Sequence, residues 1–103
     1  MNFSDFEDRV NEDVLQEIED PAEIAAEVSK LLNGLNQEDV FVVRRLAKEI
    51  AATIAQELAF KEPDMVVVVR KLGAVLEPMI AWLKRHGVNG RSLRQAMPIN
   101  IRV

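Results

Sequence analysis

The sequence predicts an all-α fold: a compact bundle of four main helices, followed by a short fifth helix and an extended C-terminal tail. Apolar side chains recur at three- and four-residue intervals along most of the 103 residues, as on one face of a helix. Residues able to cap helices stand at the expected breaks, and the short linkers favour antiparallel neighbours in a bundle. We therefore expect residues 1–97 to form a single helical domain and residues 98–103 to form the tail.

The fourth helix, expected over about residues 64–86, is the most apolar stretch and should form the centre of the bundle. Its apolar side chains fill one broad arc on a helical wheel, which is typical of a helix covered on most sides. The arc consists of Val68, Val69, Leu72, Val75, Leu76, Met79, Ile80, Trp82 and Leu83. Gly87 suits a left-handed cap, whereas Pro78 predicts a kink or a division into two shorter helices.

Each of the three earlier helices is expected to begin behind a side chain that can cap it. These pairs are Ser4 with residues 5–19, Asp20 with residues 21–33, and Asn36 with residues 37–60. The first helix places its apolar side chains at four-residue spacing, at Phe6, Val10, Val14 and Ile18. The main apolar face of the third helix consists of Val43, Leu46, Ala47, Ile50, Ile54 and Leu58.

Two apolar patterns are candidates for binding a partner protein. A second row on the third helix consists of Phe41, Ala52, Ala55 and Ala59. Its small residues allow a neighbouring helix to approach closely, either within the domain or across a homodimer. The tail alternates apolar and polar residues through Ile99, Ile101 and Val103, which is a strand period. It is expected to fray, to lie along a groove, or to add to a partner's sheet.

The net charge of −4 conceals a strong asymmetry between the two ends of the chain. Residues 1–20 contain eight acids and one base, whereas five bases and no acid follow Glu77. The ends should attract one another. Either the termini dock on the same molecule, or the charges support head-to-tail assembly or a charged partner.

No pattern of catalytic residues is present in the sequence. The absence of cysteine excludes disulfides, thiolate metal sites and cysteine nucleophiles. His86 is the single histidine, so neither a second histidine nor a cysteine can complete a metal site or a nucleophile–base pair. Glu77 is the one acid inside the apolar helix and is interpreted as an edge charge. We expect no enzymatic activity, no cofactor and no metal.

The chain is expected to be cytoplasmic and to have no membrane partner. Its acidic start is the reverse of a secretory signal. The charges Arg70, Lys71 and Glu77 argue against a membrane span within the apolar helix.

Residues 79–97 have the outline of a helix-turn-helix motif, with a helix, a turn at Gly87 and a short basic helix. The cations that would meet nucleic acid are Lys84, Arg85, Arg91 and Arg94. Arg91 and Arg94 would face a groove, and Lys84 and Arg85 the phosphate backbone. The acidic first helix would repel DNA unless it lies on the far side.

The sequence therefore predicts a non-enzymatic protein–protein interaction module. We expect it to self-associate, with a homodimer as the first hypothesis, and to act as an adaptor, an inhibitor or an assembly component. The alternative is a DNA-binding module that uses residues 79–97.

Overall fold

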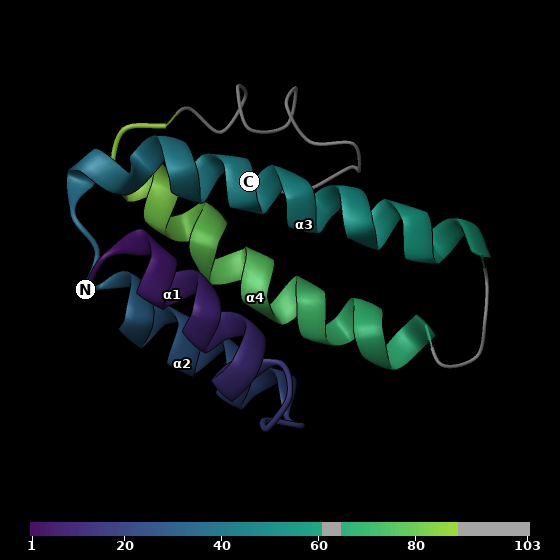
Figure 1. Ribbon diagram of the computed structural model, residues 1–103. Coiled ribbons are helices and arrows are strands. Elements are labelled where there is room, and N and C mark those ends of the chain that lie inside the picture. Colours follow the sequence, from purple (N-terminus) through teal and green to yellow (C-terminus); the bar gives the residue numbers. More distant parts are fainter. Residues whose placement is uncertain (61–64, 89–103) are drawn as a thin grey trace.

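The computed structural model describes residues 1–60 and 65–88, and every regular element in these ranges is helical (Figure 1). The elements are α1 (Phe3–Arg9), the π-helical η1 (Val10–Val14), α2 (Pro21–Leu32), the 3₁₀-helical η2 (Gln37–Asp39), α3 (Val40–Phe60) and α4 (Met65–Arg85). The predicted all-α bundle with four main helices is confirmed for these residues. The expected fifth helix and the tail at residues 98–103 lie outside the described residues.

α3 and α4 form a long hairpin, and the shorter α1 and α2 cover only part of it (Figure 1). α3 and α4 have 21 residues each and α2 has 12. At a rise of about 1.5 Å per residue, the long helices measure about 31 Å and α2 about 18 Å. The end of the hairpin, where α3 finishes and α4 begins, therefore extends past the other two helices.

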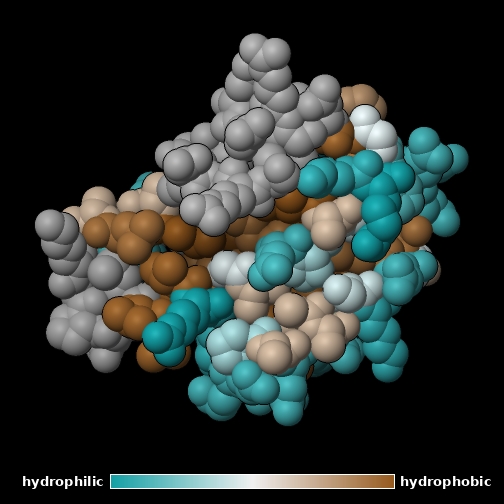
Figure 2. All heavy atoms as spheres, turned by 180° about the vertical axis from the view of Figure 1, so that it is seen from behind, coloured by the Kyte–Doolittle hydropathy of each residue, from teal (hydrophilic) through white to brown (hydrophobic). Residues whose placement is uncertain are grey.

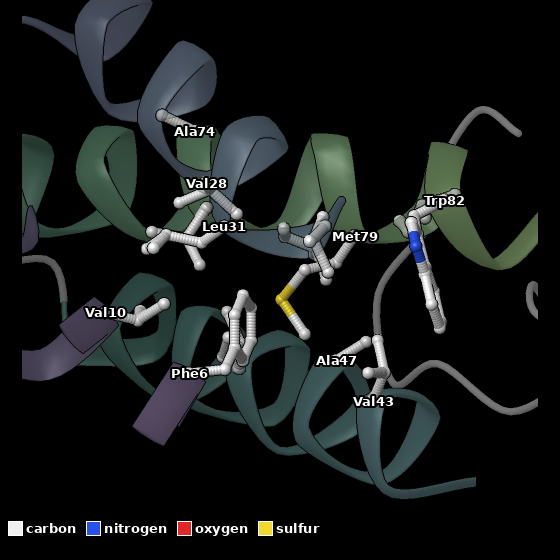
Figure 3. Close-up of a cluster of buried hydrophobic side chains, with 14 of the residues drawn as sticks. Phe6, Val10, Val28, Leu31, Val43, Ala47, Ala74, Met79 and Trp82 are labelled. Atoms are coloured by element: carbon white, nitrogen blue, oxygen red, sulfur yellow. The ribbon is translucent and has the colours of Figure 1, made fainter. Parts of the chain in front are cut away.

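The core lies where all four helices meet, as Figure 3 shows. Phe6 from α1 and Met79 from α4 point toward one another beneath Val28 and Leu31 of α2, and both are fully buried. Trp82 is 2% exposed and lies near Val43 of α3. No polar or charged side chain is buried in the described part of the chain, so apolar burial dominates the stability of the bundle.

The local capping signals have mixed outcomes. Asp20 caps α2 as predicted, because its Oδ1 accepts a hydrogen bond of 3.2 Å from the Ala22 N–H. The prediction that Ser4 caps the first helix is wrong. Asn2 does so instead, since its Oδ1 accepts the Asp5 N–H at 2.8 Å and α1 begins at Phe3.

Asn36 precedes the third helix as predicted, and its N–H donates to Oδ2 of Asp39 at 3.0 Å. Gly87 closes α4 with a φ of +93°, a left-handed conformation that glycine adopts without strain. The N–H of Val88 donates to the Leu83 carbonyl at 3.0 Å, and the N–H of Gly87 donates to the Lys84 carbonyl at 3.2 Å. These two bonds form a Schellman motif, which ends the helix as the sequence indicates.

Three expectations about the long helices are corrected. Pro78 does not divide α4, which continues from Met65 to Arg85 with Pro78 buried. Leu58 and Val68 do not belong to the buried face, since their side chains are 49% and 41% exposed. The physical reason for their exposure is that both lie in the part of the hairpin that α1 and α2 are too short to cover.

The first helix also differs from the expected span of residues 5–19. It changes from α to π geometry at Val10, and the N–H of Leu15 donates to the Val10 carbonyl at 2.9 Å. In an α-helix each four-residue step turns about 40° beyond a full circle. The wider π turn offsets this drift. It thereby keeps Phe6, Val10 and Val14 directed into the core, where each is 2% exposed or less.

Candidate functional site

His86 takes part in closing α4. Its Nδ1 lies 2.8 Å from the Trp82 carbonyl oxygen, and because a carbonyl only accepts, Nδ1 carries the proton. The imidazole stacks on the Trp82 indole with ring centroids 4.1 Å apart. Within residues 1–60 and 65–88, no cluster of three or more histidine, aspartate or glutamate side chains could hold a metal ion. In the same ranges no helix has the length and apolar character to cross a bilayer.

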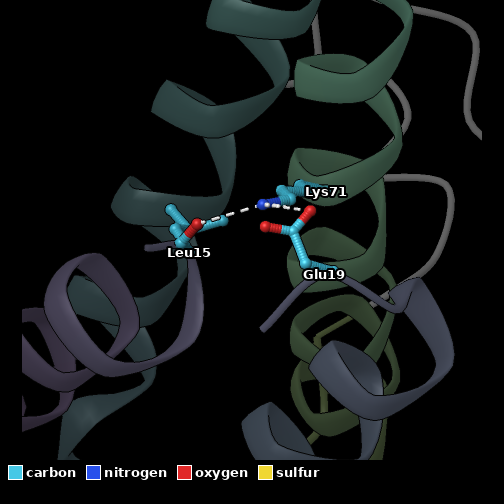
Figure 4. Close-up of polar contacts among 3 residues, drawn as sticks. All are labelled: Leu15, Glu19 and Lys71. Carbon is cyan, nitrogen blue, oxygen red and sulfur yellow. Dashed lines mark hydrogen bonds and ion pairs between the residues drawn. The ribbon is translucent and has the colours of Figure 1, made fainter. Parts of the chain in front are cut away.

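Lys71 connects α4 to the segment that links η1 to α2 (Figure 4). Its Nζ lies 3.5 Å from the Leu15 carbonyl oxygen and 3.6 Å from a carboxylate oxygen of Glu19. The Lys71 side chain is only 16% exposed, whereas Glu19 is 85% exposed. The partly buried ammonium therefore holds the end of η1 against α4, and it has a structural role.

The uncovered end of the α3–α4 hairpin forms an apolar surface. Its exposed side chains are Leu58 (49%), Val66 (51%), Val67 (56%) and Val68 (41%). Hydrophobic surface gathers toward this end of the hairpin in the view from behind, at the left (Figure 2). We call these four residues the hairpin-end surface. β-branched and leucine side chains contribute apolar area without a polar group, so this surface suits contact with another apolar surface.

The predicted row on α3 lies at the surface over part of its length. Phe41 is 79% exposed, Ala59 is exposed, and Ala52 and Ala55 are partly buried. The structure adds three cations to this row, because Phe41 lines an open hollow with Arg44, Arg45 and Lys48. The sequence signal was present, since these four positions have the spacing of one helix face. The predicted row contains only apolar residues, so these three cations lie outside it.

A second open groove, of about 610 Å³, runs between α2 and α4. It is lined by Pro21, Ala22, Ala25, Arg70, Gly73, Ala74 and Glu77. A Cβ added to Gly73 would meet no atom within 4 Å, so the space above this glycine is empty. Arg70 and Glu77 are exposed, and neither side chain has an ionic or hydrogen-bonding partner among the described residues. The sequence pattern predicts Glu77 as an edge charge and gives no sign of a link with Arg70.

Of the remaining candidate residues, two lie in the described part of the chain and five lie outside it. Lys84 and Arg85 are exposed in the last turn of α4. The other predicted positions lie outside the described residues; they are Arg91, Arg94, Ile99, Ile101 and Val103. The acids of α1 and η1 that are exposed are Asp5, Asp8, Glu12 and Asp13.

We compared the chain with protein-family models, curated proteins and solved structures, and none of them matches it.

Proposed function

We propose that this protein is a non-enzymatic interaction module that associates with itself, with a dimer as the first hypothesis. The hairpin-end surface supports the proposal most directly, because four large apolar side chains are exposed together there. Exposed apolar patches on a protein surface often mark sites that bind proteins. A module of this type would act as an adaptor, an inhibitor or an assembly component, and we expect it to work in the cytoplasm.

The character of the described cavities also supports this proposal. Ligand sites of enzymes are concave pockets in which a few polar groups converge on one position. The α2–α4 groove is open and lined mainly by proline, alanine and glycine, with the exposed Arg70 and Glu77 at its edge, and the hollow on α3 is open and lined by Phe41 and three cations. Such shallow surfaces suit contact with another helix better than enclosure of a small substrate.

Substitution of Val66 tests the proposal. Val66→Asp adds a charge to the hairpin-end surface, and Gln16→Asp adds one at an exposed position near the end of η1, away from that surface. Phe41→Asp is a third variant, which tests the row on α3. We expect sedimentation equilibrium to show association of the unmodified chain and of Gln16→Asp. For Val66→Asp we expect the association constant to fall by at least about tenfold. Association that only Phe41→Asp weakens would move the interface to α3.

Nucleic-acid binding is the second candidate function, and the exposed cations Lys84 and Arg85 at the end of α4 favour it. It predicts duplex binding whose logarithm decreases linearly with the logarithm of salt concentration. Replacing Arg91 and Arg94 with glutamate should abolish that binding. Absence of any duplex binding at low salt would exclude this function.

A further inference from the structure

The charges on the outer face of α4 are arranged so that this face is complementary to itself. Arg70, Gly73, Ala74 and Glu77 line one side of the α2–α4 groove. Arg70 and Glu77 are exposed, Gly73 is partly buried, and Ala74 is 7% exposed, at the boundary between this face and the core. Arg70 lies three positions before Gly73, and Glu77 lies three positions after Ala74. The point midway between Arg70 and Glu77 along the helix is therefore also midway between Gly73 and Ala74, the two smallest residues of the four.

We infer that two copies of this chain pair through antiparallel α4 helices, with a two-fold axis between Gly73 and Ala74. This arrangement places Arg70 of each copy opposite Glu77 of the other, so that two identical ion pairs form. It also places the exposed Val66 opposite the exposed Ala81, because Val66 lies seven positions before Gly73 and Ala81 lies seven positions after Ala74. An interface of this kind is isologous, the type found in two-fold symmetric dimers. The inference rests on the proposed self-association and specifies its surface.

The centre of the face leaves room for a second helix. A glycine in the middle of a helix is destabilising relative to alanine. Among the described residues nothing fills the space above Gly73, since a Cβ added there would meet no atom within 4 Å. Ala22 and Ala25 of α2 flank the groove with equally short side chains. A second α4 can approach closely there, since helix separation depends on the side chains at the crossing.

The charges indicate why a second copy is the occupant. Arg70 and Glu77 are exposed without partners among the described residues. Their charges are opposite, so each can be the ionic partner of the other. A foreign helix would need an acid opposite Arg70 and a base opposite Glu77, at the same separation along its axis. A second copy of α4 has both by symmetry.

Charge reversal tests the inference directly. Arg70→Glu places two acids opposite each other twice in the dimer, and Glu77→Arg does the same with two bases. We expect each single variant to associate at least about tenfold more weakly than the unmodified chain. The double variant Arg70→Glu/Glu77→Arg restores both pairs with reversed polarity and should associate normally. Lys30→Glu, which changes the net charge as Arg70→Glu does but lies on α2, is the matched control.

Mixing the two single variants gives the sharpest outcome. In a heterodimer of Arg70→Glu with Glu77→Arg, both contacts again join opposite charges, so native mass spectrometry should detect the heterodimer and little of either homodimer. Neither misfolding nor net charge predicts this rescue. Association that is insensitive to the single variants, or a mixture as weak as its components, would overturn the α4 interface while leaving self-association intact. A monomer at every concentration would overturn both proposals.

Discussion

At the scale of single residues, side chains that interact with the backbone were the easiest to anticipate. Asp20 and Gly87 act as the sequence indicates, because capping depends only on neighbours a few positions away. Asn2 replaces Ser4 as the first cap, since both residue types can cap and sequence alone does not decide which turn forms first. The contact of Lys71 with Leu15 and Glu19 could not be predicted, because it joins residues far apart in the chain.

Gly73→Ala should separate the stability of the fold from self-association. The added methyl meets no atom within 4 Å, so we expect the free energy of unfolding to rise by about 1 kcal/mol. Self-association should weaken, because the methyl occupies the centre of the proposed interface. Urea denaturation and sedimentation measure the two effects. Gly34→Ala is the control: its Cβ would lie 3.1 Å from Cε of Met1, so no gain in stability is expected there. Stronger association of Gly73→Ala would contradict the proposed crossing.

Lys71→Glu should destabilise the fold. It places a carboxylate against the Leu15 carbonyl oxygen and the Glu19 carboxylate, in a position where Lys71 is only 16% exposed. We expect a loss of about 1–2 kcal/mol in the free energy of unfolding. Arg70→Glu, one residue earlier and exposed, should change it by less than about 0.5 kcal/mol when the chain is monomeric. Equal losses in denaturant titrations of the two variants would show that the Lys71 contact contributes nothing specific.

At the scale of helices, apolar spacing predicts the elements but not how completely their neighbours cover them. Leu58 and Val68 fit the apolar faces of α3 and α4, yet they are exposed because α1 and α2 are short. Whether these side chains are covered depends on how the four helices align, and the spacing of apolar residues within one helix carries no information about that alignment. The π segment was not predicted either, because the four-residue spacing of Phe6, Val10 and Val14 drifts by only about 80° and also fits one face of a regular α-helix. The π turn in the structure brings these three side chains closer to a single line.

Deletion of Asn11 tests this explanation of the π segment. Without this exposed residue, Phe6, Val10 and Val14 would occupy positions four and then three residues apart, which share one face of an ordinary α-helix. We expect the free energy of unfolding to remain within about 1 kcal/mol of the parent. Deletion of Glu27 from α2 is the matched control, since it turns Val28 away from the core and should cost far more. Equal destabilisation by the two deletions in thermal unfolding would contradict the explanation.

At the scale of the whole molecule, the sequence predicts an all-α bundle built around α4, and the described residues confirm it. The candidate site was less accessible from the sequence. The row on α3 was identified, but the hairpin-end surface and the α2–α4 groove arise from the assembly of helices of unequal length. Both surfaces adjoin α4, whose inner face forms the core while its outer face is exposed at Val66, Arg70 and Glu77. Folding therefore depends on the inner face of α4, and the proposed self-association would use the exposed residues beside it.

The solution mass of the unmodified chain tests the central claim, that this bundle functions by contact with a second copy. Light scattering over a wide range of protein concentration should give a mass that rises from the chain mass of 11.6 kDa toward twice that value. High salt should weaken the association only in part, because it screens the ion pairs but not the apolar contacts. A mass of 11.6 kDa at every concentration would contradict the account.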